Sequence, residues 1–415
     1  MAQTPEFLHD FRSMSTIGAT AGGGVDRQAA TVADGQTRNW FRGLVEGYGF
    51  DVRYDQVGNQ FALLELVPGA PYIAVGSHLD SQPLGGRFDG AYGVLAGAHA
   101  AKALAALGID GTGEAKFNIA VVNWFNEEGC RFKPSMMGSS VFTGKLAAEQ
   151  VLETTDPKGV TVREALEAIG TIGDFTLDVA AYVEIHIEQG RSLDDTGVQI
   201  GVVESTWAAN KYEYRVIGDQ SHTGATVIAD RKDALLGAAG MIVAARDVAD
   251  QFTDADEMVV TSCGEIKVFP NSPVVVASDV ELLIDIRSTS VDRLAEADAE
   301  LIRRFEEAAK RADVVLERGK EHIWGANEYD KRGQELAAAA ADSLGLSHSQ
   351  VRTLAGHDST NLKDMVPTIM LFVPSVDGIT HNEKELTKDE DMLAGVELLT
   401  EVLRRVAAGK FVAAA

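Results

Sequence analysis

Apolar runs of strand length alternate with helix-length stretches over most of the chain. Residues 72–75, 117–125 and 181–187 are rich in β-branched and aromatic residues, as buried strands are. The alanine- and glycine-rich stretch 91–107 lies between the first two and has helical character. Strands that alternate with helices favour an α/β fold, so we expect a mainly parallel sheet with helices on both faces.

The pattern changes after Trp207, where a compact second segment begins. Its order is strand, helix, two strands and helix, at residues 211–217, 233–252, 257–269, 274–287 and 291–311. This order predicts a smaller α+β domain of the split βαβ (ferredoxin-like) kind. We therefore expect a main domain formed by residues 1–206 and 322–415, with residues 207–321 inserted as a second domain. A chain of 415 residues is also longer than a single hydrophobic core usually spans, which favours two domains.

Composition narrows the classes of partner. The 37 basic and 62 acidic residues give a net charge of −25, which argues against binding to nucleic acid or to an anionic membrane surface. The longest apolar run, residues 234–245, is too short to cross a bilayer. With only two cysteines and no signal-peptide pattern in the first residues, we expect a cytoplasmic protein.

Residues that can bind a metal follow the predicted strands. His78 and Asp89 come after the first strand, Glu128 after the second, and His186 lies at the end of the third. The carboxyl ends of parallel strands meet at one edge of a sheet, and imidazole and carboxylate suit zinc-like cations. Any one of these segments alone could equally be a hydrogen-bonded turn; the repetition favours a metal site.

With His381, the set reaches five nitrogen and oxygen ligands, which is enough for two adjacent ions that share one carboxylate. A bridging Asp89 would leave His78 and His186 for one ion, and Glu128 and His381 for the other. Neither ion then has a full protein shell, as expected of a catalytic site. Asp80 could orient His78, while Glu127 could act as the general base.

Seven motifs together resemble one group of enzymes. They are GSHLDS, GGRFDGAYG, NEEG, HIEQG, GDQSHTG, AGHDS and FVPSVDGITHNE, in that order along the chain. They are similar to those of the N-carbamoyl-L-amino-acid amidohydrolase, β-ureidopropionase and allantoate amidohydrolase group of the di-metal aminoacylase/carboxypeptidase superfamily. The resemblance implies two divalent ions (zinc, manganese, cobalt or nickel) and attack of a metal-bridging hydroxide on a ureido or amide carbonyl.

The resemblance also assigns roles outside the ligand set. It implies that Arg287 binds the carboxylate of a small substrate, and that Gln189 and His357 line the pocket. His222 resembles the histidine that reaches the partner subunit's site and stabilises the oxyanion. We therefore expect a homodimer formed through the inserted domain.

One position departs from the pattern of this group. Val274 stands where an Asn shortly before the arginine is usual, and Asn271 could substitute for it. An N-carbamoyl-L-amino acid is the expected substrate, but the same machinery could act on allantoate, an N-acyl amino acid or a dipeptide, or deaminate an amino-aromatic acid. A catalytically silent binding or assembly protein is a further alternative.

Overall fold

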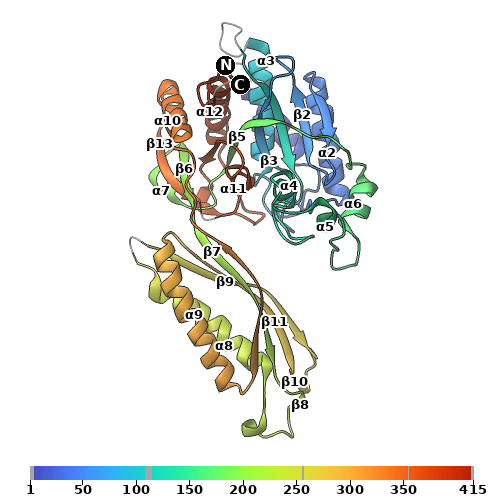
Figure 1. Cartoon of the computed structure of the whole chain (residues 1–415), viewed down its shortest axis with the longest axis vertical. Coiled ribbons are helices and arrows are strands. Elements are labelled where there is room, and N and C mark those ends of the chain that lie inside the picture. The colour runs from blue at the N-terminus through green and yellow to red at the C-terminus, as the bar shows by residue number, and fades with distance from the viewer. Residues whose placement is uncertain (1–3, 108–114, 255–256, 354, 413–415) are drawn as a thin grey trace. The chain divides into compact units, whose positions relative to one another are not determined.

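The computed structural model describes residues 4–107, 115–254, 257–353 and 355–412 (Figure 1). The chain divides into two compact units. Unit 1 comprises residues 1–204 and 329–415, and unit 2 comprises residues 205–328. Each unit has its own hydrophobic core.

Unit 1 is built on an eight-stranded mixed sheet of order β1-β2-β4-β3-β5-β14-β6-β13. Its four central strands, β4, β3, β5 and β14, are parallel to one another, whereas β1, β2 and β6 pair antiparallel. The bounds are β1 Asp51–Tyr54, β2 Gln60–Leu64, β3 Tyr72–His78, β4 Asn118–Trp124, β5 Val179–Ile187, β6 Ile200–Thr206, β13 His348–Thr353 and β14 Thr368–Val373. The predicted α/β class with a mainly parallel sheet is confirmed.

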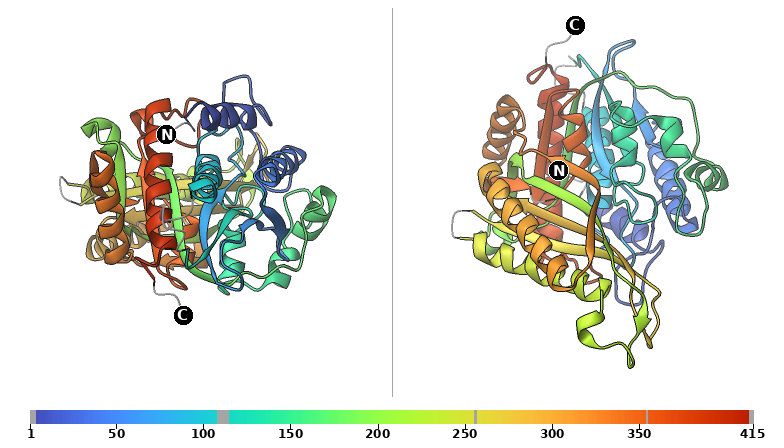
Figure 2. Two further views of the ribbon diagram at one scale, coloured as in Figure 1. Left: turned by 90° about the horizontal axis from the view of Figure 1, so that it is seen from above. Right: turned by 60° about the horizontal axis from the view of Figure 1, so that its bottom comes forward.

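Helices cover both faces of this sheet. The larger core lies on one face, where Ile73 and Val75 of β3 and Ile185 of β5 pack against the long helices, and α3 and α12 lie side by side (Figure 2). On the other face, Trp124 and Tyr182 pack with Leu362 of α11. The helices are α1 Thr4–Met14, α2 Val32–Gly47, α3 Ala91–Leu107, α4 Met137–Phe142, α5 Ala148–Leu152, α6 Val162–Ile169, α7 Ser192–Thr196, α10 Lys331–Leu344, α11 Asp358–Leu362 and α12 Asp389–Ala407.

Unit 2 is a four-stranded antiparallel sheet of order β12-β7-β11-β9 with two helices on one face. Figures 1 and 2 show α8 and α9 packed together on that face. Its elements are β7 Ala208–Ile217, β8 Ser221–His222, α8 Ala234–Phe252, β9 Val259–Phe269, β10 Val275–Val276, β11 Asp279–Ser288, α9 Val291–Arg311 and β12 Val315–Trp324. The short strands β8 and β10 pair with each other.

The sequence pattern did not predict strand β12, which completes the βαββαβ order of unit 2. This strand is an edge strand and largely exposed, and its charged residues hide the alternation expected of a strand. Because β12 belongs to unit 2, the unit runs to residue 328, past the predicted limit of 321. None of the helices in the described ranges is long and apolar enough to cross a membrane.

Candidate metal centre

The carboxyl ends of the parallel strands carry the five predicted ligands to one place. His78 is the last residue of β3, Glu128 follows β4, His186 lies at the end of β5, and His381 follows β14. Asp89 lies in the loop between β3 and α3. Four neighbouring strands thus deliver side chains that lie far apart in sequence.

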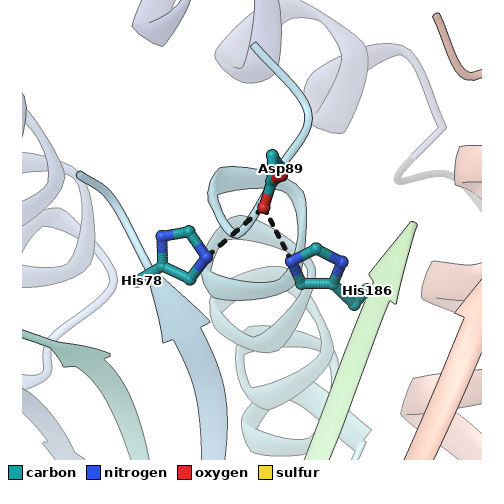
Figure 3. Close-up of side chains that lie close together, drawn as sticks. All are labelled: His78, Asp89 and His186. Atoms are coloured by element: carbon teal, nitrogen blue, oxygen red, sulfur yellow. Dashed lines mark ion pairs between the residues drawn. The ribbon is translucent and has the colours of Figure 1, made fainter. Parts of the chain in front are cut away.

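Asp89 lies between two groups of ligand atoms. Its Oδ1 is 3.4 Å from Nε2 of His78 and 3.0 Å from Nε2 of His186 (Figure 3). Its Oδ2 is 3.4 Å from Nε2 of His381, which in turn is 3.4 Å from Oε2 of Glu128. The ligand atoms of each triad all lie within 4.8 Å of one another. One carboxylate therefore faces two potential metal positions, one oxygen to each.

The backbone fixes which nitrogen the buried histidines present. Nδ1 of His78 lies 2.9 Å from the carbonyl oxygen of Asp80, and Nδ1 of His186 lies 2.9 Å from the carbonyl oxygen of Ile187. A carbonyl only accepts hydrogen bonds, so each Nδ1 is the donor and each Nε2 keeps its lone pair. Gly90 donates its N–H to Nε2 of His186, which agrees with this tautomer.

A tight turn after β4 presents Glu127 and Glu128. Asn126 adopts the left-handed conformation, with φ 52°, and its side chain donates to the carbonyl oxygen of Phe132. The Asp80 carboxylate accepts the backbone N–H groups of Glu127 and Glu128 at 3.2 and 3.3 Å. Asp80 thus supports His78 through its carbonyl oxygen and the glutamate turn through its carboxylate.

Glu127 lies against the first triad. Its Oε2 is 3.6 Å from Nε2 of His78, and the residue is 8% exposed. Burial raises the pKa of Glu127 well above its usual range, and the nearby carboxylates of Asp358 and Glu128 add to this, although His78 opposes it. Burial also acts on Asp89, but His186, His381 and His78 outweigh it and hold its pKa well below the usual range.

The donor set fits divalent cations. Around the triads lie several buried carboxylates, namely Asp80, Asp89, Glu127, Glu184, Asp358 and Glu385. Burying so many acids together is costly unless cations offset their charge. Neutral imidazole and carboxylate are the ligands that zinc, manganese, cobalt and nickel share.

Two predicted pocket residues lie in direct contact with the ligand set. Nε2 of Gln189 donates to Oδ2 of Asp89 at 2.9 Å and lies 3.3 Å from Nε2 of His381. The ring of His357 is buried, packs edge-to-face on His186 at 4.6 Å, and its Nε2 lies 3.1 Å from Oγ1 of Thr353. Burial lowers the pKa of His357 well below its usual value.

The other predicted residues lie in unit 2. Oδ1 and Oδ2 of Asp285 each accept a hydrogen bond from the guanidinium of Arg287, both at 2.8 Å. His222 is exposed on β8 and its Nδ1 accepts the N–H groups of Gly224 and Ala225, both at 3.0 Å. Asn271 is exposed. Val274 is 58% exposed, and its carbonyl oxygen accepts the N–H of Thr223, next to His222.

Two buried glutamates at the centre were not predicted from the sequence. Glu184 accepts hydrogen bonds from Ser77 and from the backbone of Ser359, both at 2.8 Å. Glu385 accepts the N–H groups of Phe88 and Asp89, and burial beside Asp89 raises its pKa to about 7. Glu184 shares the alternating face of β5 with His186, which was a usable signal. Glu385 lies within a loop, where acidic residues are usually exposed.

Comparison with known proteins identifies the family. The model of peptidase family M20/M25/M40 matches residues 74–405. The chain belongs to this family. It is 34% identical to the N-carbamoyl-L-amino-acid amidohydrolase of Rhizobium meliloti over 93% of this chain and 92% of that protein. It is 30% identical to the allantoate amidohydrolase of Bacillus subtilis, over 95% of each.

A solved structure agrees with these relatives. The amidase of the hydantoinase/carbamoylase family from Burkholderia vietnamiensis superposes with a TM-score of 0.91 at 34% identity, covering 98% of this chain and 97% of that one. The resemblance stated from the motifs is therefore confirmed, and this M20/M25/M40 family member is a hydrolase of the amidohydrolase type. Enzymes of the family depend on metal, as the two triads suggest for this chain.

Proposed function

We propose that the protein hydrolyses the N-carbamoyl group of an N-carbamoyl-L-amino acid at a two-metal site. The single observation that carries this proposal is the position of Asp89, whose two oxygens face two separate ligand triads. The similarity to the N-carbamoyl-L-amino-acid amidohydrolase of Rhizobium meliloti supports the substrate class.

The five ligands would hold two divalent ions, with His78 and His186 on one, Glu128 and His381 on the other, and Asp89 between them. When bound, such ions polarise a carbonyl and lower the pKa of water. Glu127, 3.6 Å from His78, would take a proton from the attacking water and return it to the nitrogen that leaves. One C–N bond of the ureido group breaks, and the carbamic acid that forms then loses carbon dioxide, so the products are the amino acid, ammonia and carbon dioxide.

Arg287 would bind the carboxylate of the substrate. Asp285 accepts two hydrogen bonds from the guanidinium of Arg287, and Nζ of Lys211 lies 3.6 Å from Oδ2 of Asp285. This pairing holds the planar guanidinium in one orientation, which suits two-point recognition of a carboxylate.

Unit 2 would also form the homodimer. Strand β9 is an edge strand with exposed Ile266 and Phe269, and neighbouring α8 exposes Leu236 and Val243. An edge strand beside an apolar helix face is a common pairing surface between copies of a chain. Since Nδ1 of His222 accepts two backbone N–H groups, its Nε2 carries the proton and can donate to an oxyanion in the partner's site.

Substrate assays with and without metal test the proposal. The purified protein, stripped by a chelator, should lose activity towards N-carbamoyl amino acids and recover it with zinc, manganese, cobalt or nickel. Glu127→Gln should bind metal normally and lower kcat by about 10²- to 10⁴-fold. Glu188→Gln is the matched control, because Glu188 is also a buried acid near the end of β5 but accepts N–H groups of α7. Full activity without metal would exclude this mechanism.

Allantoate is the second candidate substrate. The 30% identity to an allantoate amidohydrolase supports it. The valine at position 274, in place of the usual asparagine, motivates testing substrates other than N-carbamoyl amino acids. A panel containing allantoate and several N-carbamoyl amino acids decides between the two. Turnover of allantoate alone would replace the first substrate and keep the same machinery.

A further inference from the structure

We propose that Glu385 is a positioning residue that sets the orientation of Asp89, and that Gly86 provides the space that Glu385 needs. The inference rests on the proposed two-metal site. It concerns how the shared carboxylate is held between the two triads.

Glu385 binds the backbone that presents Asp89. Its Oε1 accepts the N–H of Phe88 at 2.9 Å and the N–H of Asp89 at 3.1 Å. Glu385 is 4% exposed, so water competes little for these bonds. Two consecutive N–H groups held by one oxygen fix the orientation of the peptide between them, and with it the direction in which the Asp89 side chain leaves the backbone.

Gly86 makes this contact possible. A Cβ at position 86 would lie 1.9 Å from Oε1 and 2.3 Å from Oε2 of Glu385. Any side chain there would push the Glu385 carboxylate away from Phe88 and Asp89. The glycine is therefore explained by the close approach of a carboxylate.

The same five-residue segment holds the shared carboxylate from two sides. His381 lies 3.4 Å from Oδ2 of Asp89, and Glu385 binds the backbone N–H of Asp89. Between them, Glu383 faces a different partner: it accepts hydrogen bonds from the hydroxyl of Thr20 and the N–H of Gly22. Glu383 is thus a matched control, since it lies in the same segment but contacts the 20–24 loop.

The test measures zinc affinity of the full-length protein by competition with a chromophoric chelator. Glu385→Ala should weaken zinc binding about 10- to 100-fold at both positions, because Asp89 is shared by both. Gly86→Ala should have a similar effect. Glu385→Gln keeps an acceptor oxygen and should stay close to the wild type, as should Glu383→Ala.

A double-variant cycle separates positioning from general loosening. Once the side chain of residue 385 is shortened, an added Cβ at 86 meets no carboxylate. Gly86→Ala/Glu385→Ala should therefore bind zinc no more weakly than Glu385→Ala alone. Thermal unfolding in excess chelator reports whether each variant folds without metal.

The outcomes are distinct. Wild-type zinc affinity in folded Glu385→Ala would overturn the inference, as would equal weakening in Glu383→Ala. If Glu385→Ala does not fold, the zinc affinity of Gly86→Ala is compared with that of Glu385→Gln. Wild-type zinc affinity in Gly86→Ala then overturns the inference. If the wild-type chain itself binds no metal, the proposed function fails instead.

Discussion

The two oxygens of Asp89, one facing each triad, have different surroundings. Oδ1 meets two buried imidazoles, whereas Oδ2 meets His381, Gln189 and the hydroxyl of Thr380. His381 is also the most exposed ligand, and its side chain is 47% exposed. We therefore expect the His78 side to bind the first ion more tightly than the His381 side.

Single ligand variants should separate the two positions. His381→Asn should lose the weaker ion and keep the tighter one, because Asp89, His78 and His186 remain. Asp89→Asn should lose both, since an amide is neutral and coordinates through one oxygen. Metal content after dialysis, measured by atomic emission, checks this. Loss of both ions in His381→Asn would show that the triads do not act separately.

A second residue-scale prediction concerns pH and stability in chelator. Nε2 of His99 is 3.0 Å from Oδ2 of Asp10, and its Nδ1 is buried with no hydrogen-bond partner among the described residues. Burial lowers the pKa of His99, although Asp10 opposes the shift. A histidine whose folded pKa is depressed binds protons more readily when unfolded, so protonation favours unfolding.

The free energy of unfolding should therefore fall as the pH drops below about 6.5. The fall should be at most about 1.4 kcal/mol for each pH unit, because one proton is involved. His99→Gln removes the titrating group and should flatten this dependence relative to the wild type. Urea unfolding between about pH 7.5 and 5.5 measures the difference. Equal slopes in both proteins would contradict the assignment.

At the scale of elements, helix α3 begins directly after the ligand loop and packs closely on the sheet. A Cβ at Gly93 would lie 2.2 Å from the carbonyl oxygen of Ile185 in β5, which also carries His186. Four residues later, a Cβ at Gly97 would meet only the methyl groups of Val75 and Val121, at 3.3 and 3.4 Å. The absence of a side chain at Gly93 therefore allows the close distance between α3 and β5. At Gly97, the neighbouring valine side chains could shift slightly to accept a methyl group.

Gly93→Ala should destabilise the protein by about 1–3 kcal/mol through overpacking, and should weaken metal binding by moving the Asp89 loop. Gly97→Ala should stay within about 1 kcal/mol of the wild type, because alanine's better helix propensity offsets a tight contact. Denaturant unfolding of both variants gives the comparison. An equal loss of free energy of unfolding in both variants would refute the close approach of Gly93 to Ile185.

At the scale of the whole molecule, the proposed dimer makes each active site depend on two chains. Glu127→Gln and His222→Ala should each be nearly inactive as homodimers. Refolded as a mixture, a heterodimer would pair an intact Glu127 in one chain with an intact His222 from the other. Random mixing should then restore about a quarter of the wild-type activity.

The measurement is the specific activity of the mixture against each parent, with the oligomeric mass from light scattering. If His222 acted within its own chain, no activity would return on mixing. A monomeric mass for the active wild type would remove the dimer altogether.

The sequence alone predicted most of the buried elements of the main sheet and the candidate metal ligands. Apolar runs of strand length indicate strands that are buried on both faces, so β3, β4 and β5 were predicted within a few residues. The same rule failed for β12, since an exposed edge strand buries little and alternates weakly. Ligand-type residues at the ends of strands were also visible, because parallel strands share one catalytic edge.

Only the tertiary structure decided which atoms meet. The donor role of Nδ1 in His78 and His186 depends on the path of the backbone directly after each residue. The two-sided position of Asp89 and the anchoring of the ligand loop by Glu385 depend on contacts between residues up to about 300 positions apart. Such contacts arise from sheet order and loop paths, and local periodicity carries no information about either.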